Sequence, residues 1–113
     1  MYDNQNIFAK ILRGEIPCQK LFENDIVLAF NDIEPVAPVH VLIIPKIACQ
    51  SFHDFAVKGD VGDFFKAVQA IATQLGVEKT GYRLITNHGQ DANQTVKHFH
   101  VHLIAGKDLG GLL

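Results

Sequence analysis

The 113-residue chain contains no tryptophan, one methionine and only two cysteines. The cysteines, Cys18 and Cys49, form no C-x-x-C pair, which excludes a disulfide framework and a four-cysteine zinc site. Free cysteines are usually buried, so we expect two buried free thiols.

Charge and long apolar runs are also scarce. Charged residues make up 19% of the chain and the net charge is -2, so the dense basic stripe that binds long nucleic acids is absent. The longest apolar run, Ile26 to Phe30, is far shorter than the ~20 residues that cross a bilayer, and the N-terminus lacks the basic flank and apolar segment of a signal peptide. These absences favour a single cytoplasmic domain over residues 1–113 with no membrane partner.

The apolar residues that are present predict five strands and two helices. Helical spacing covers residues 7–12 and 61–75, where Asn6 and Asp60 are candidate N-caps. Alternation and β-prone composition predict strands over residues 20–23, 26–31, 39–44, 82–86 and 98–105. The pair Asn24-Asp25 suits a tight hairpin between the first two strands. We therefore expect an α+β fold with the helices on one side of a five-stranded antiparallel sheet.

Three of the six histidines occupy alternate positions in the last predicted strand, at His98, His100 and His102. Alternate side chains of a strand share a face at roughly 6.6 Å spacing, so the three imidazoles are expected to point the same way. The intervening Phe99 and Val101 then point toward the core. The strand therefore has one apolar face and one face rich in ring nitrogens.

These imidazoles allow three interpretations. They could be solvated surface groups, or two of them could share a zinc ion, although the outer pair is about 13 Å apart and no Asp, Glu or Cys lies close in sequence. They could also act on phosphorus, because a neutral imidazole with a pKa of ~6.5 is a nucleophile near neutral pH. That role requires its second ring nitrogen to be fixed by a backbone carbonyl or a flanking histidine. The polar loop 87–95 offers donors for phosphate oxygens directly before the triad, and it favours this third interpretation.

The run His98 to Ile104 resembles the His-φ-His-φ-His-φ-φ signature of the histidine triad (HIT) superfamily, which hydrolyses or transfers nucleotidyl groups. Further segments stand in the order and spacing of its Hint branch, at residues 7–8, 13–17, 28–30, 32–33, 35–40 and 44–46. The resemblance covers nearly the whole chain. It implies a HIT-like fold and a homodimer in which the main helices and adjoining strands form one ten-stranded sheet.

The same resemblance implies roles for particular residues. His100 would be the nucleophile, His102 and His40 would flank the phosphate, and His98 would orient the nucleophile's ring. Asp32 would bind the ribose. The expected base pocket consists of Ile7, Phe8, Ile11, Phe30 and Ile33. The expected contacts to the phosphate and the leaving group come from Asn87, Gln94, Thr95 and Val96.

The implied activity is hydrolysis of purine nucleoside phosphoramidates, such as AMP or GMP conjugates of amines, through a covalent nucleotidyl-histidine and with no cofactor or metal. Ala9 and Ala48 replace residues that bind zinc in some relatives, and Asn93 stands where Gly is usual, which predicts a different bend of the phosphate loop. Two alternatives stay open. One is a Fhit-like hydrolase of dinucleoside polyphosphates, and the other is a nucleotide-binding module without catalysis.

Overall fold

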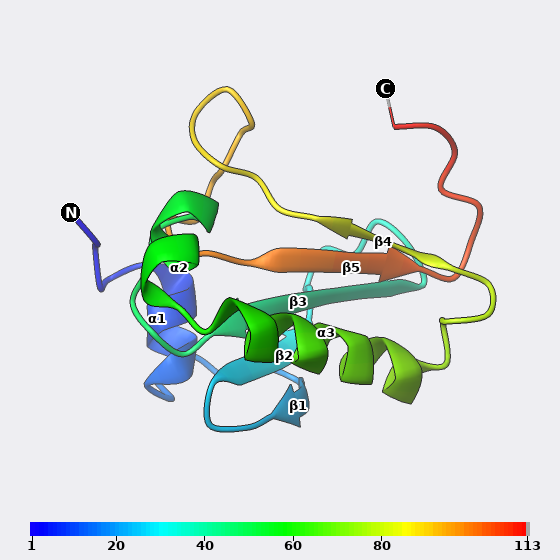
Figure 1. The fold of residues 1–113 in the computed structure, drawn as a ribbon, viewed down its shortest axis with the longest axis horizontal. Helices are drawn as coiled ribbons and strands as arrows, with labels where there is room; N and C mark the ends of the chain where they lie inside the picture. Colours follow the sequence, from blue (N-terminus) through cyan, green and yellow to red (C-terminus); the bar gives the residue numbers. More distant parts are fainter. Residues whose placement is uncertain (113) are drawn as a thin grey trace.

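The computed structural model describes residues 1–112, which form three helices and five strands (Figure 1). In chain order these are α1 (Ile7–Leu12), β1 (Lys20–Glu23), β2 (Val27–Asn31), β3 (Val39–Pro45), α2 (Phe52–Lys58), α3 (Val61–Leu75), β4 (Tyr82–Ile85) and β5 (Val101–Ala105). None of these helices is long and apolar enough to cross a bilayer.

The strands form one five-stranded antiparallel sheet, as the sequence predicted, and their order in it is β1-β2-β3-β5-β4. The β1–β2 hairpin closes at Asn24, whose side-chain oxygen accepts the backbone N–H of Ile26 and of Val27 at 2.9 and 2.8 Å. β3 lies at the centre and pairs His40 with Ile104 and Leu42 with His102. The sheet thereby joins residues about 60 positions apart in the sequence into one surface.

The main core lies between the sheet and α3, which crosses one face of the sheet in Figure 1. The Asp60 side chain accepts the N–H of Asp63 and caps α3, and Gly76 ends it in the left-handed region at φ 72°. From the sheet and from Phe99, which precedes β5, this core contains Val27, Ala29, Val41, Ile43, Phe99, Val101, Leu103 and Ala105. Because side chains alternate along each strand, the residues between them form the opposite face.

That opposite face is covered by α1, so the expectation that the helices share one side of the sheet is wrong. Phe8 and Ile11 of α1 pack on an apolar patch of the sheet made of Leu28, Phe30, Leu42 and Ile44. Asn6 caps this helix as predicted, its side chain accepting the N–H of Ala9. The central strands are apolar on both faces, and each face therefore requires a covering helix.

The helix α2 was not predicted. Its N-cap Ser51 makes no side-chain hydrogen bond, and Phe55 is its one buried residue. The ring of Phe55 stacks on Phe99 with centroids 4.5 Å apart, so tertiary packing places this helix. β5 also begins at Val101 rather than at residue 98, because the N–H of Phe99 bonds to the carbonyl of Cys49 instead of to β3.

Candidate active site

A cavity of about 760 Å³ opens on the α1 side of the sheet, within the usual size range of small-molecule sites. It lies between α1, the segment after β2, the loop before the triad and the triad itself. The predicted site residues that line it are Ile7, Phe8, Ile11, Phe30, Asp32, Ile33, Asn87, Gln94, Thr95, Val96, His100 and His102. His98 and His40 are buried behind this wall.

One end of the cavity is apolar. Phe8 and Phe30 meet edge to face with ring centroids 5.7 Å apart, and both are core residues as well as cavity walls. Ile33 is 90% exposed and stands at the rim. The sequence analysis missed further lining residues, Ile16, Pro17, Asn31, Glu34, Val36 and Leu42. Cys18 also lines the cavity and is only half-buried, so the expectation of two buried thiols holds for Cys49 alone.

The three triad imidazoles lie on the α1 face, opposite the side chains of Phe99, Val101 and Leu103. The Phe8 ring contacts the His100 ring edge-on at 5.0 Å. Adjacent imidazoles of His100 and His102 have centroids 5.1 Å apart. The predicted alternation of side chains between the two faces therefore includes residues 98–100, although the hydrogen-bonded strand β5 begins only at Val101.

Backbone carbonyls fix the protons of His98 and His100. The carbonyl of Pro45 lies 2.9 Å from His98 Nε2, and the carbonyl of His98 lies 2.7 Å from His100 Nδ1. A carbonyl only accepts, so each of these ring nitrogens must carry the hydrogen. Neutral His100 therefore keeps its lone pair on Nε2. His98 contributes its carbonyl to this arrangement, whereas its ring bonds elsewhere, with Nδ1 2.6 Å from the hydroxyl of Tyr2.

A backbone N–H fixes the second pair of histidines in the same way. The N–H of Val36 donates to His40 Nδ1 at 3.1 Å, so neutral His40 carries its hydrogen on Nε2. That nitrogen lies 2.9 Å from His102 Nδ1 and 3.4 Å from a carboxylate oxygen of Asp32. His102 Nδ1 must then accept, which leaves the hydrogen of neutral His102 on Nε2.

Two ring nitrogens in this set have no protein partner within residues 1–112, Nε2 of His100 and Nε2 of His102. Every fully buried side-chain nitrogen and oxygen in the described chain has a hydrogen-bond partner. Both Nε2 atoms are therefore reachable from the cavity that their residues line. His100 Nε2 therefore presents a lone pair to the cavity, and the neighbouring His102 Nε2 presents an N–H donor.

Burial favours the neutral forms that this pattern requires. Desolvation lowers the pKa of His98 and of His100, partly offset in each case by the hydrogen bond to a carbonyl. Desolvation, together with the neighbouring His100 and His40, lowers the pKa of His102 to about 4. At neutral pH His102 is therefore an N–H donor and carries no charge.

The loop before the triad is held by Gln94. Its side-chain oxygen accepts the N–H of Gly89 at 3.0 Å, and its nitrogen donates to the carbonyls of Gln50 and Val96 at 2.7 and 3.0 Å. Gln94 therefore shapes the loop, although it also lines the cavity. Asn93 has φ 58°, in the left-handed region that glycine adopts freely and asparagine tolerates, and the different bend of this loop stays a prediction.

Within residues 1–112, the cluster with metal-ligand chemistry is Asp32, His40 and His102, with ligand atoms all within 4.8 Å of one another. Hydrogen bonding already joins the facing nitrogens of the two imidazoles. A metal ion would have to displace the proton of His40 Nε2 and open that contact. In the resting site, these two imidazoles are therefore joined by a shared hydrogen bond.

Residues 13–109 match the HIT domain family. The chain is 47% identical to an uncharacterised HIT-like protein of Azospirillum brasilense, covering 99% of this chain and 94% of the relative. It is 40% identical to the purine nucleoside phosphoramidase of Escherichia coli, covering 96% and 93%. Among solved structures, a histidine triad protein from Clostridium difficile is 43% identical, with full coverage of both chains and a TM-score of 0.91. A HIT family hydrolase from Clostridium thermocellum is 39% identical, with 98% coverage of both chains and a TM-score of 0.86.

Proposed function

The chain belongs to the HIT family of hydrolases, and from the proton pattern of its histidines we propose that it cleaves the P–N bond of purine nucleoside 5′-phosphoramidates. The observation that carries the proposal is the lone pair on His100 Nε2 beside the N–H of His102 Nε2, both open to one nucleotide-sized cavity. A lone pair attacks phosphorus, and an adjacent N–H stabilises the charge that develops on a phosphoryl oxygen.

The cavity supports a nucleoside monophosphate as the bound part of the substrate. Ile7, Phe8 and Ile11 supply apolar surface on which a purine stacks. Asp32 lines the same cavity and lies 3.4 Å from His40 Nε2, and its carboxylate accepts hydrogen bonds from the ribose hydroxyls. One oxygen of this carboxylate already accepts the N–H of Glu34 at 2.8 Å, which fixes its orientation.

The reaction proceeds in two in-line steps. His100 Nε2 forms a bond to the α-phosphorus, the P–N bond breaks, and its electron pair leaves with the amine. Water then adds to the phosphorus and releases one proton to solvent, the P–Nε2 bond breaks, and its electron pair returns to His100 as the lone pair. Because the pKa of His102 is about 4, its imidazolium is scarce at neutral pH, and the proton of the departing amine comes from solvent onto the amine nitrogen itself. Asn87 and Thr95 line the same cavity and donate to phosphoryl oxygens.

The decisive experiment combines steady-state assays with trapping of the intermediate, using adenosine 5′-phosphoramidate of a simple primary amine. His100→Ala should reduce kcat at least 100-fold, because removal of a covalent nucleophile costs this much or more. The matched control is His53→Ala, which removes an exposed histidine on α2 outside the cavity. Mixing the wild-type protein with substrate should produce a nucleotidyl group on His100, located by mass spectrometry.

Two results would reject the proposal. One is a His100→Ala variant with kcat within tenfold of wild type, which corresponds to only about 1.4 kcal/mol of the barrier. The other is absence of any adduct and of turnover in the wild type, which leaves a binding module. Preferred turnover of a dinucleoside polyphosphate in the same assay would reassign the substrate to the Fhit kind.

We also propose that a second copy of the chain completes the sheet. Within residues 1–112, β4 pairs with β5 alone and leaves one edge open. Leu84 on this strand is 42% exposed, and Phe65 and Val61 of α3 expose apolar surface as well. Pairing of two β4 edges would join five strands to five and cover these side chains. Sedimentation should show a dimer that Leu84→Lys dissociates, and a wild-type monomer at micromolar concentration would refute the dimer.

A further inference from the structure

The tyrosine at the start of the chain contacts the triad. The Tyr2 hydroxyl lies 2.6 Å from His98 Nδ1, and the two rings meet edge to face with centroids 5.7 Å apart. His98 is completely buried, whereas Tyr2 is half-buried and does not line the cavity. This contact has no part in the chemical steps above.

The direction of this hydrogen bond is determined. His98 Nε2 carries the ring hydrogen because it faces the carbonyl of Pro45 at 2.9 Å. Nδ1 of the neutral ring is then an acceptor, so Tyr2 donates. Both nitrogens of His98 are thereby engaged, and a flip of the ring would break two hydrogen bonds in a site closed to water.

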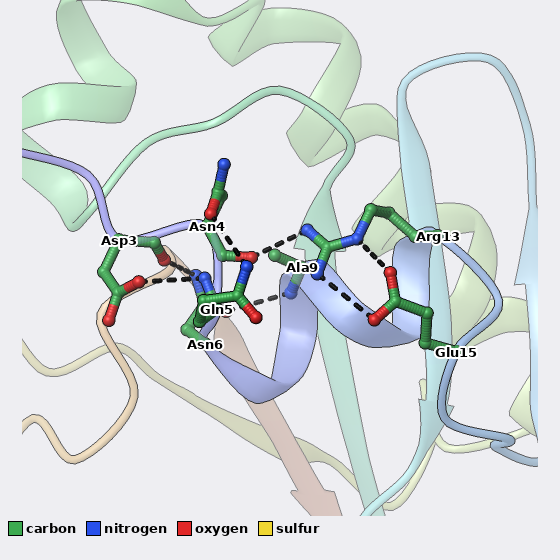
Figure 2. Close-up of polar contacts among 7 residues, drawn as sticks. All are labelled: Asp3, Asn4, Gln5, Asn6, Ala9, Arg13 and Glu15. Carbon is green, nitrogen blue, oxygen red and sulfur yellow. Dashed lines mark hydrogen bonds and ion pairs between the residues drawn. The ribbon is translucent and has the colours of Figure 1, made fainter.

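The segment that carries Tyr2 is itself held in place (Figure 2). The side-chain nitrogen of Asn6 donates a hydrogen bond to the backbone oxygen of Asp3 at 2.8 Å. The carboxylate of Asp3 accepts a hydrogen bond from the backbone N–H of Gln5 at 2.9 Å. Arg13, just after α1, donates to the carbonyl of Asn4 at 2.7 Å. The N-terminal segment is thus fastened to both ends of α1, which places Tyr2 at the first triad histidine.

His98 in turn fixes the nucleophile. Its carbonyl is the acceptor, at 2.7 Å, for the Nδ1 hydrogen of His100, and that bond keeps the lone pair on Nε2. The Phe8 ring touches both imidazoles edge-on, at 6.4 Å from His98 and 5.0 Å from His100. Any displacement of His98 therefore moves both contacts that orient His100.

We propose that Tyr2 is a positioning residue for His100, acting through the ring of His98. The hydroxyl engages the lone pair of His98 Nδ1 and holds the ring of His98 in one orientation, and this orientation in turn holds the carbonyl that directs the lone pair of His100 into the cavity. The kinetic part of this inference rests on the proposed function. The spectroscopic part concerns the resting protein and stands without it.

The test is Tyr2→Phe, which retains the ring contact with His98 and removes only the donor. The matched control is Tyr82→Phe, which removes the same atom from the other tyrosine of the chain, on β4 and outside the cavity. On an AMP–amine conjugate, Tyr2→Phe should lower kcat about tenfold and leave KM within about twofold, because the nucleotide pocket is untouched. The control should match wild type in both constants.

The second readout is the set of ¹⁵N chemical shifts of His98 and His100 in the resting protein, which report hydrogen position and hydrogen bonding at each ring nitrogen. Tyr2→Phe should shift the signals of His98 and of His100, whereas Tyr82→Phe should shift neither. If His100 keeps its wild-type signals in Tyr2→Phe, or if kcat stays within twofold of wild type, the positioning role is refuted. A wild-type protein inactive on phosphoramidates would instead refute the proposed function, and the ¹⁵N shifts would still decide the role of Tyr2.

Discussion

Mild acid should destabilise this protein through its buried histidines. The folded state holds His102 neutral with a pKa of about 4, whereas the unfolded chain has the ordinary value of 6.5. As pH falls below 6.5 the unfolded chain takes up a proton that the folded protein refuses. Stability is therefore lost between pH 6.5 and 4, and His98 and His100, whose pKa values are also lowered, act in the same direction.

The size of the effect follows from the shift of His102. For a fully shielded ring, moving from pH 7.5 to 5.0 would cost about 2 kcal/mol, and screening by cavity solvent reduces this to about 1 kcal/mol. Domains of this size have a total stability of about 5–15 kcal/mol, so the loss is measurable. Carboxyl groups with lowered pKa values, such as Asp54, also stabilise the fold, but their contribution is lost mainly below pH 4.

The assay is urea unfolding at pH 7.5, 6.5, 5.5 and 5.0 at one protein concentration, because dimerisation would make stability concentration-dependent. His102→Gln should reduce the difference between pH 7.5 and 5.0, whereas His53→Gln, at an exposed position, should leave the wild-type difference. Two results would refute the assignment of a neutral His102. One is a wild-type free energy of unfolding that differs by less than about 0.5 kcal/mol between pH 7.5 and 5.0, and the other is a His102→Gln variant that keeps the wild-type difference.

Three further variants address packing, the ribose and the loop. Phe99→Ala should lower the free energy of unfolding by about 3–5 kcal/mol in urea titrations, because the buried ring stacks on Phe55, and a loss below about 1 kcal/mol would contradict this packing. Asp32→Asn should raise KM about tenfold for a ribonucleotide conjugate and less for its 2′-deoxy analogue. Equal increases in KM for both substrates would show that Asp32 does not bind the ribose hydroxyls. Gln94→Leu leaves the N–H of Gly89 without its partner and should cost about 1–3 kcal/mol of stability together with a lower kcat/KM, both compared with wild type.

The sequence predicts those parts of the fold whose signals are local. Asn6 and Asp60 cap their helices through their own side chains, and Asn24 closes the hairpin in the same way. The helix α2 lacks such a signal, because Ser51 makes no capping bond and the helix is positioned by aromatic stacking on a residue over 40 positions away. The two-sided arrangement of helices was missed for a similar reason, since a fully apolar strand does not specify which helix covers which face.

For the candidate site, sequence pattern and resemblance together named many of the residues that line the cavity, and they required a partner for the second ring nitrogen of His100, where the structure has the carbonyl of His98. The alternation of histidines indicates a shared face, yet it does not reveal which ring nitrogen carries hydrogen. That information resides in partners outside the alternating pattern. The carbonyl of Pro45 lies 53 positions from His98, and the ring of His40, which the nearby N–H of Val36 orients, lies 62 positions from His102. Tyr2 also lies 96 positions from the histidine it contacts, and no periodicity could connect the two.

The tautomers of all four histidines follow from three peptide groups, those of Val36, Pro45 and His98. Peptide groups are chemically alike for every residue except proline, which lacks the N–H, so exchanging the side chain of Val36 for any non-proline side chain would leave the donor intact. Proton placement is therefore inherited with the path of the main chain, and it would persist through extensive divergence in sequence. A single inserted residue between β2 and β3 would disrupt it more than several side-chain replacements there.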